Sequence, residues 1–307
     1  MKETPSQLDI PSYVMNFPFT LDTKNPNNKW MTELSEDKLK INKNKAYRQF
    51  FDLYNFLAGS GLVYLIPNYY NIKANIYQDQ VYTANVGIYL PHVENNTIIL
   101  SNFTSEPRKG EEELAMPLFK SMGYDVLQSP FKFEGEADLK HLYDNIYIGG
   151  YGQRTQKETH QWINEQYNSK IIPVNMVDEY LYHLDCSIFP LNRNKTMMCT
   201  ELFEKSELKE ISKVTEIVDI DIDAAYSGIC NSVRMGNTVL CASNISELKK
   251  TDEDYEYERH KIGILERICA NEGMEPIFFN LSEYMKSGAM LSCMVMHLNY
   301  EENTPLV

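Results

Sequence analysis

Apolar and polar positions follow two different periods along the chain, and together they predict a mixed α/β fold. Between residues 35 and 58, apolar side chains recur at the spacing of an amphipathic helix, and Gly59 and Gly61 end the pattern. The same period predicts helices at residues 111–122, 156–167, 201–213 and 254–273. Thr155 is the expected N-cap of the helix at residues 156–167.

Short apolar runs between the predicted helices have the length and composition of strands. They lie at residues 62–66, at 76–90 around a polar kink at 83–87, and at 97–100, 124–128, 147–150, 170–174, 182–189, 217–222, 231–242 and 277–281. The order strand, strand, helix, strand therefore repeats at a spacing on the order of 50 residues. Small units of this kind bury their faces against one another, so the pattern predicts a ring of similar α/β units.

The first 31 residues break this pattern, since they are rich in Pro and Asn with aromatic residues between them. This predicts an irregular segment that lies on the body of the protein, either as a plain packed arm or as a lid. No Pro/Ser-rich linker or charge block marks a boundary elsewhere. Residues 1–307 are therefore predicted to form a single domain.

Composition narrows the classes of partner. The formal net charge of −14 argues against nucleic acid, because a phosphate backbone would be repelled, and favours small cations. The N-terminus has no apolar signal core and no run approaches the length of a membrane span, which predicts a cytoplasmic protein. The 6 cysteines are scattered, so neither a zinc site nor a disulfide framework is indicated. No metal or cofactor is expected.

One cysteine, Cys293, stands between a stretch of small residues (287–289) and the apolar run Met-Val-Met-His-Leu. The small residues allow a ligand to approach, and the apolar run reads as a buried strand. The thiol is therefore predicted at a loop-to-strand edge, where it would be both fixed and reachable. The same surroundings are also typical of a cysteine that only fills the core.

The remaining candidates fit chemistry at a guanidinium carbon, a poor electrophile whose charge is delocalised. Attack on it requires a soft nucleophile, carboxylates that grip the planar N–H groups, and an acid that protonates the departing nitrogen. Cys293 offers the nucleophile, and a bound cation would lower the pKa of its thiol. His183 offers the acid and then the base, and the predicted strand places it on one face with Asp185.

Acids and arginines elsewhere in the chain complete this set. The candidate residues for binding the guanidinium are Glu134, Asp138, Asp185 and Asp79. Arg108 and Arg154 lie in glycine-containing loops and are candidates for clamping a carboxylate. Taken singly, none of these signals is specific, because the acidic turn at 134–138 is typical of a solvated loop.

Five motifs in one order resemble the guanidino-group-modifying superfamily of arginine deiminases, dimethylarginine dimethylaminohydrolases, amidinotransferases and arginine dihydrolases. They are Asp79-Gln-Val-Tyr-Thr-Ala-Asn85, Phe133-Glu134-Gly-Glu-Ala-Asp138, Gly152-Gln-Arg154-Thr155, His183-Leu-Asp185 and Ser287-Gly-Ala-Met-Leu-Ser-Cys293. The resemblance implies a five-bladed α/β propeller, the pentein fold, with ββαβ repeats around a central active site and no metal.

The resemblance also implies roles for individual residues. Cys293 would be the nucleophile, and His183 and Glu134 the general acid/base pair. Asp185 and the segment 79–85 would bind the guanidinium, and Arg108 and Arg154 the carboxylate of the substrate. Glu136 places an extra acid where small residues are usual, which leaves the size and charge of the substrate open.

Asn85 departs from the Asp common at its position in deiminases and dimethylarginine hydrolases. A neutral amide both donates and accepts, which suits a site that also holds a neutral ureido group. The resemblance is therefore nearest to the arginine dihydrolases, which convert arginine through citrulline to ornithine, ammonia and carbon dioxide.

The sequence thus predicts a hydrolase of linear amidines that acts on arginine or a close relative through a covalent Cys293 thiouronium. Alternatives remain open: one round of hydrolysis to citrulline, as in a deiminase or dimethylarginine hydrolase, or amidino transfer to an amine. A propeller that only binds, as in ribosome anti-association factors, is the non-enzymatic alternative. The predicted partner is a small guanidino compound, and a homo-oligomer is left open.

Overall fold

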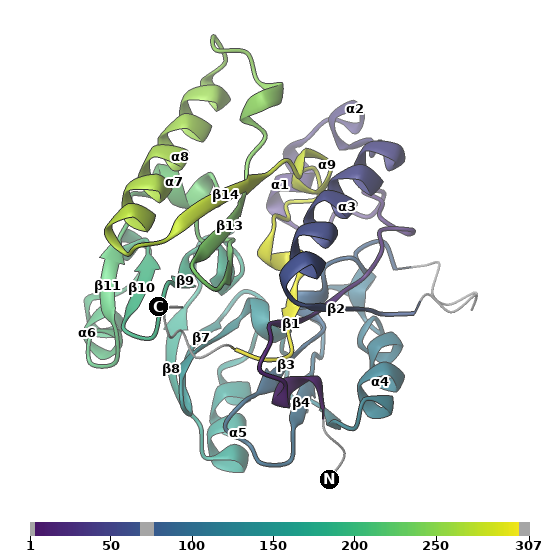
Figure 1. Cartoon of the computed structure of the whole chain (residues 1–307), viewed down its shortest axis with the longest axis vertical. Coiled ribbons are helices and arrows are strands. Elements are labelled where there is room, and N and C mark those ends of the chain that lie inside the picture. Colours follow the sequence, from purple (N-terminus) through teal and green to yellow (C-terminus); the bar gives the residue numbers. More distant parts are fainter. Residues whose placement is uncertain (1–3, 68–76, 301–307) are drawn as a thin grey trace.

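Five small β-sheets surround the middle of the molecule (Figure 1). The computed structural model describes residues 4–67 and 77–300, and the strands of these residues form five sheets of three strands each. The first strands of neighbouring sheets contact one another, β15 with β3 and β6 with β9, so these strands are the inner ones. The fold is the five-bladed α/β propeller that the resemblance implies.

Four blades are each formed by one continuous stretch of chain, in the predicted order strand, strand, helix, strand. The first two contain β3 (Gly87–Leu90), β4 (Thr97–Leu100), α4 (Glu112–Ser121) and β5 (Asp125–Gln128), then β6 (Leu139–Tyr143), β7 (Ile146–Tyr151), α5 (Lys157–Tyr167) and β8 (Lys170–Asn175). The next two contain β9 (Ile188–Pro190), β10 (Lys195–Met198), α6 (Lys205–Ile211) and β11 (Glu216–Asp219), then β12 (Val233–Met235), β13 (Thr238–Ala242), α8 (Glu253–Asn271) and β14 (Glu275–Phe279).

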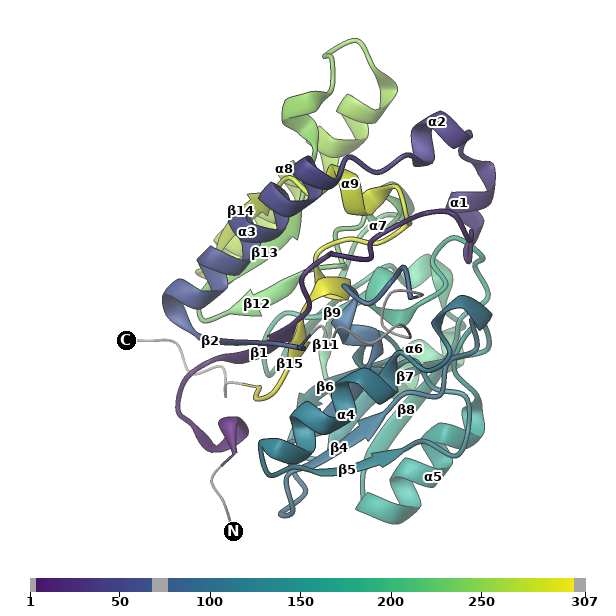
Figure 2. The same ribbon diagram turned by 90° about the vertical axis from the view of Figure 1, so that its right-hand side faces the viewer.

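The pairing within a blade explains why each contains one helix. The inner and middle strands are antiparallel and joined by a short turn, whereas the middle and outer strands are parallel. A parallel pair needs a crossover, which the helix supplies while covering the apolar outer face. In Figure 2, α4 lies along β4 and β5, and α3 lies beside β14.

The fifth blade joins the two ends of the described chain. It consists of β15 (Met296–His297), β1 (Ser12–Met15), α3 (Lys43–Ser60) and β2 (Leu62–Leu65), with Tyr13 opposite His297. The prediction that residues 1–31 are irregular is therefore wrong for 12–15, which form a fully buried middle strand. Four buried residues are too few to show a period, and their partners come from distant parts of the chain.

Further local predictions differ from the structure, and among them the helix expected at 201–213 is limited to α6 (Lys205–Ile211). The helix expected at 35–58 is divided into α2 (Glu36–Leu39) and α3, because the Asn42 side chain accepts a hydrogen bond from the Lys45 backbone N–H and starts a new helix. Strand β2 is half-exposed at the edge of its sheet. Residues 77–82 form turns rather than a strand, and Ile76 lies outside the described residues.

Short helical turns precede most of the inner strands, and they determine where the polar motifs lie. They are η3 (Thr83–Asn85) before β3, η5 (Gly135–Ala137) before β6, η6 (Leu184–Cys186) before β9 and η9 (Ser292–Met294) before β15. Contacts of η3 with both η5 and η9 show that these turns meet at one end of the propeller axis. His183 therefore leads into a turn, and the strand expected at 182–189 begins only at Ile188.

The remaining short elements lie in connections within the blades and between them. They are η1 (Pro5–Gln7), α1 (Lys29–Glu33), η4 (Glu106–Arg108), η7 (Thr200–Leu202), α7 (Ile222–Tyr226), η8 (Ile245–Glu247) and α9 (Ser282–Met285). None of the helices in the described residues combines the length and apolarity needed to span a membrane.

Candidate active site

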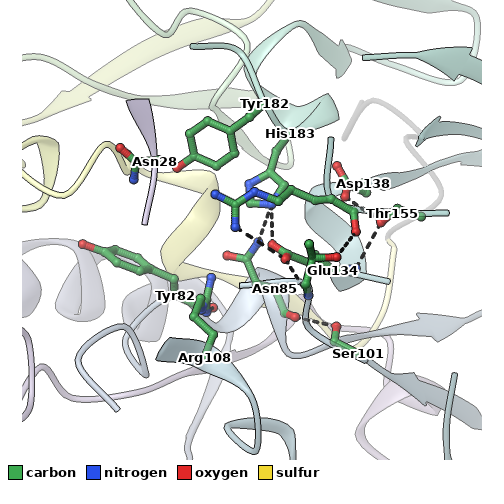
Figure 3. Close-up of polar contacts among 12 residues, drawn as sticks. Asn28, Tyr82, Asn85, Ser101, Arg108, Glu134, Asp138, Thr155, Tyr182 and His183 are labelled. Carbon is green, nitrogen blue, oxygen red and sulfur yellow. Dashed lines mark hydrogen bonds and ion pairs between the residues drawn. The ribbon is translucent and has the colours of Figure 1, made fainter. Parts of the chain in front are cut away.

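A small hollow lies where the turns meet, and it collects side chains from both ends of the chain. Its walls are Asn27, Asn28, Asp79, Tyr82, Asn85, Arg108, Arg154, Tyr182, His183, Ser287, Ala289 and Cys293. Figure 3 shows several of these side chains turned toward one another. The volume open to the centre of a water molecule is about 20 Å³, which is room for about one water. Of the nine candidate residues, six line this hollow, and Glu134, Asp138 and Asp185 lie behind it.

His183 is held by Glu134, as the predicted acid/base pair requires. Its Nε2 atom lies 2.7 Å from Glu134 Oε2, and both side chains are buried (Figure 3). Burial opposes the charge of Glu134, but the hydrogen bond to His183 and the Arg154 guanidinium outweigh it and lower the pKa of the carboxyl to about 2. Glu134 is therefore a permanent carboxylate that orients the imidazole.

This pair makes a testable contribution to stability. Because the pKa of Glu134 is about 2 in the folded protein and about 4.5 when unfolded, its contribution is present above pH 4.5 and is lost as the pH falls. Between pH 5 and pH 3 it accounts for a fall of about 2 kcal/mol in the free energy of unfolding. Urea unfolding at both pH values should show this extra fall in the wild type but not in Glu134→Gln. Equal pH dependence of the two proteins would contradict the assignment.

Asp138 supports the turn behind His183 instead of facing the hollow. Its Oδ2 atom accepts a hydrogen bond from the Thr155 hydroxyl (2.6 Å) and its Oδ1 atom accepts one from the Leu184 backbone N–H (3.2 Å). These contacts do not fit the expected role of Asp138 in binding the guanidinium. Burial raises the pKa of this carboxyl to about 6. Thr155 is consequently not the N-cap of α5, a position that Gln156 occupies.

Cys293 lies on η9, directly before the inner strand β15, close to the predicted edge. Its Sγ atom is 3.3 Å from Asn231 Nδ2 and 3.8 Å from Asp185 Oδ2. Burial and the charge of Asp185 raise the pKa of the thiol to about 12, although the hydrogen bond from Asn231 acts in the opposite direction. In this arrangement Cys293 is a protonated thiol that needs a cation to become a thiolate.

Asp185 contacts the cysteine turn and does not line the hollow. Its Oδ2 atom accepts a hydrogen bond from the Ser292 hydroxyl at 2.7 Å, and the side chain is fully buried. Asn231 accepts a second hydrogen bond from the Ser292 backbone N–H at 2.9 Å. Sequence reasoning missed Ser292 and Asn231. The repeat would have indicated Asn231, because it precedes the inner strand of the fourth blade as the other motifs precede theirs.

Arg108 is buried and already has several partners. Its Nε and Nη2 atoms donate to Glu111 Oε2 at 3.0 and 2.8 Å, and the guanidinium lies over the Phe103 ring. Nη2 also approaches the backbone carbonyls of Asp79 and Tyr82. These contacts fix the guanidinium at the wall of the hollow. Glu111, which fixes it, was not a candidate from the sequence.

Arg154 also lines the hollow. Its Nη1 atom is 3.6 Å from Glu134 Oε1, and its Nη2 atom donates to the Asn27 backbone carbonyl at 2.5 Å. The guanidinium lies 4.8 Å from the centre of the Tyr182 ring. Arg154 therefore links the catalytic candidates to the N-terminal segment that covers the hollow.

That cover consists of the Asn-rich stretch around residues 25–28. Asn27 Nδ2 donates to Asp79 Oδ2 at 2.6 Å, and Asn28 Nδ2 donates to the Ser287 carbonyl at 2.8 Å. Burial raises the pKa of Asp79, against the opposing charge of Arg108. Asn27 and Asn28 were not candidates, although the Pro/Asn-rich composition had already suggested a lid.

Asn85 and Glu136 lie on neighbouring turns but point to different places. Asn85 Nδ2 is 3.4 Å from His183 Nε2, so the neutral amide lies beside the imidazole in the hollow. Glu136 instead accepts hydrogen bonds from the backbone N–H and the ring of His297 at 2.9 and 2.5 Å, outside the hollow. The extra acid therefore does not restrict the charge or size of a ligand at this site.

The described residues contain no group of three or more His, Cys, Asp or Glu side chains placed to hold a metal ion. The chemistry available in the hollow comes from a thiol, an imidazole, amides, carboxylates and two guanidinium groups. Such a set suits nucleophilic attack with proton transfer.

Comparison with known proteins gives one family match and several distant relatives. A model of the family described as N,N dimethylarginine dimethylhydrolase, eukaryotic, matches residues 16–299. The bifunctional arginine dihydrolase/ornithine cyclodeaminase AgrE of Nostoc is 24% identical over 266 residues, which cover 84% of this chain and 34% of AgrE. The chain thus spans about a third of that relative.

Two further similarities concern a mycobacterial protein and a solved structure. The N(G),N(G)-dimethylarginine dimethylaminohydrolase of Mycobacterium tuberculosis is 25% identical over 224 residues, covering 72% of this chain and 66% of that protein. The product-bound N-terminal domain of ArgZ, a cyanobacterial arginine dihydrolase, superposes with a TM-score of 0.79 at 22% identity, covering 94% of this chain and 97% of that one. At this identity the superposition shows a shared fold.

Proposed function

The chain belongs to the eukaryotic N,N-dimethylarginine dimethylhydrolase family, and we propose that it hydrolyses the guanidino group of arginine or a close relative. As a member of this family it is a hydrolase of guanidino carbon–nitrogen bonds. The observation that supports a Cys293 mechanism is that Cys293 and His183, far apart in sequence, line one hollow with Asn85 and two arginines.

In the first half of the reaction, Cys293 passes its thiol proton to His183, and its Sγ atom attacks the guanidinium carbon and forms a carbon–sulfur bond. The terminal carbon–nitrogen bond breaks, and His183 delivers a proton to the departing nitrogen, which leaves as ammonia. A covalent thiouronium on Cys293 remains. His183, held by Glu134 at 2.7 Å, then accepts a proton from water, whose oxygen attacks the same carbon and releases the sulfur. The product of one round is citrulline.

Activation of the thiol depends on the substrate in this proposal. Since burial and Asp185 raise the pKa of Cys293 to about 12, the cationic guanidinium supplies the positive charge that stabilises the thiolate. Asn231 donates a hydrogen bond to the sulfur and contributes in the same direction. Asp185 and Asp138 act by holding the turns of Cys293 and His183, so we assign them positioning roles.

Labelling with small alkylating agents tests this dependence on charge. A cationic haloacetamidine should modify Cys293 faster than any other thiol, and at least tenfold faster than neutral iodoacetamide modifies it at pH 7, because it carries the charge that the resting site lacks. Cys186 is the matched control, since its Sγ atom lies 3.7 Å from the other oxygen of Asp185. Peptide mapping measures both rates. Uniform labelling of several cysteines, or equal rates with both reagents, would contradict the proposal.

Two rounds of hydrolysis, giving ornithine, two ammonia and carbon dioxide from arginine and two waters, are the version that Asn85 favours. Its amide lies beside His183, and it can donate to a neutral ureido oxygen as well as accept from a guanidinium. Product analysis with arginine distinguishes the versions. Ornithine with two equivalents of ammonia supports two rounds, whereas citrulline that accumulates with one equivalent excludes them. No ammonia at any pH would count against arginine as substrate.

The family match favours a second candidate substrate, N,N-dimethylarginine, which would release dimethylamine and citrulline. Parallel assays with equal concentrations of arginine and dimethylarginine compare kcat/KM for the two. Adding glycine or lysine to the arginine assay tests amidino transfer, because a new guanidino compound would appear only if an amine replaces water. A purely binding role would require that Cys293→Ser leaves the function in cells intact.

Residues 16–28 are proposed to act as a lid over this site, within a single catalytic domain. The hollow has room for about one water, so a guanidino compound fits only after the residues around it move apart. Asn27 and Asn28 hold the cover through Asp79, Arg154 and Ser287. Arg108 and Arg154 are the candidates for the carboxylate of the substrate once these contacts open.

A further inference from the structure

A second cavity lies at the opposite end of the propeller axis from the hollow. Its walls come from the ends of the inner strands and the residues that follow them, among them Pro91 after β3, His141 to Asp144 in and after β6, Pro190 at the end of β9, Arg234 in β12 and Tyr300 beyond β15. The turns that carry Asn85, Glu134, His183 and Cys293 lie at the other ends of the same strands. The cavity holds about 360 Å³, within the range of small-molecule sites.

Lys140 is the unusual residue of this cavity. It lies on β6, lines the cavity and is only 8% exposed. Among the described residues, none accepts a hydrogen bond from its ammonium group or forms an ion pair with it. The charge of Lys140 helps to lower the pKa of Glu136, so a carboxylate lies within electrostatic range, but no described residue supplies the hydrogen-bond acceptor that a buried ammonium needs.

The acidic residues that line the cavity with Lys140 already have hydrogen-bond or ion-pair partners. Both oxygens of Glu136 accept hydrogen bonds from His297, and Asp144 pairs with Arg193 Nη2 at 3.0 and 3.2 Å. Arg234 adds another guanidinium to the wall, which donates to the Gly236 and Leu191 carbonyls. The wall therefore carries more cations than acids, in a chain whose net charge is −14.

We propose that this cavity binds a small oxyanion, a phosphate or a carboxylate, on the ammonium group of Lys140. An ammonium group is a point charge that binds such groups from several directions. Tyr13, Tyr143 and Phe189 supply aromatic walls, so the natural ligand is an organic anion rather than a bare ion. The site is separate from the catalytic hollow and does not depend on the proposed reaction.

Calorimetric titration of the full chain with inorganic phosphate, and separately with citrate, tests the proposal. The wild type should bind at least one of the two probes. Lys140→Met should bind it at least tenfold more weakly. Lys209→Met, which removes an exposed lysine on α6, is the matched control and should bind like the wild type. Neither probe binding to the wild type, or equal binding by Lys140→Met, would overturn the proposal.

Thermal unfolding provides a second readout that a merely structural lysine would not give. Without added anion, Lys140→Met should melt at a higher temperature than the wild type, because an unpaired buried charge is replaced by an apolar side chain of similar length. The bound probe should raise the melting temperature of the wild type and leave that of the variant unchanged. A lower melting temperature of Lys140→Met without anion would show that the ammonium has a partner within the chain, and would overturn the proposal.

The same chemistry could be supplied by the carboxylates of Glu301 and Glu302, which follow Tyr300 in the sequence. The double variant Glu301→Gln, Glu302→Gln separates the two sources. Probe affinity equal to that of the wild type supports a free anion. Binding that appears only in the double variant would show that the chain's own acids occupy Lys140, and would overturn the proposal of a free ligand.

Discussion

Cys293→Ser is expected to lower kcat for guanidino hydrolysis by about 10⁴-fold or more, because the hydroxyl is a far weaker nucleophile than a thiolate and cannot form the thiouronium. Binding should be affected much less, since the serine hydroxyl fits the space of the thiol. The decisive measurement is the initial rate of ammonia release from arginine and dimethylarginine, with substrate binding measured by calorimetry on the same protein.

Cys186→Ser is the matched control for this variant. Both sulfurs lie within 3.8 Å of Asp185, one against each oxygen, but only that of Cys293 lines the hollow. Cys186→Ser should therefore keep at least a third of the activity. Comparable losses in the two variants would mean that the effect comes from disturbing Asp185 and not from losing a nucleophile.

His183→Ala is expected to lower kcat by about 10³- to 10⁴-fold, since one side chain serves as the acid of the first half-reaction and the base of the second. KM should change by less than tenfold, because the arginines, Asp79 and Asn85 remain in place. Steady-state kinetics at several pH values separate the two parameters.

A buried imidazole elsewhere in the chain provides the control. His160 on α5 is 2% exposed and lies outside the hollow, so His160→Ala removes a buried ring without touching the proposed chemistry. Its kcat should stay within threefold of the wild type, even if its melting temperature falls. A kcat for His183→Ala within tenfold of the wild type would contradict the acid/base role.

The repeated architecture could be read from the sequence because its signals are local. The order strand, strand, helix, strand arises from the hydrophobic period of each element, and four blades follow it with chain-adjacent strands. The fifth blade could not be read in this way. Strand β1 is four residues long, and its partners β15 and β2 are specified by the closure of the ring rather than by neighbouring residues.

The sequence indicated which residues belong to the candidate site better than it indicated where their side chains point. The motifs identified Cys293, His183 and the arginines, but acids in one motif look alike whether they face a ligand or hold a turn. The direction of each acidic side chain is set by the single helical turns η5 and η6. These turns are too short to produce a hydrophobic period in the sequence. They direct Glu134 to His183, Asp138 to a backbone N–H and Glu136 to the other end of the axis.

Mass spectrometry of the enzyme during turnover tests the covalent mechanism most directly. Samples quenched with acid milliseconds to seconds after mixing with arginine should contain a fraction of protein heavier by the mass of arginine minus ammonia. Peptide mapping should locate that mass on Cys293 and nowhere else. Product that forms while no adduct is ever detected, or an adduct on another residue, would contradict nucleophilic attack by this thiol.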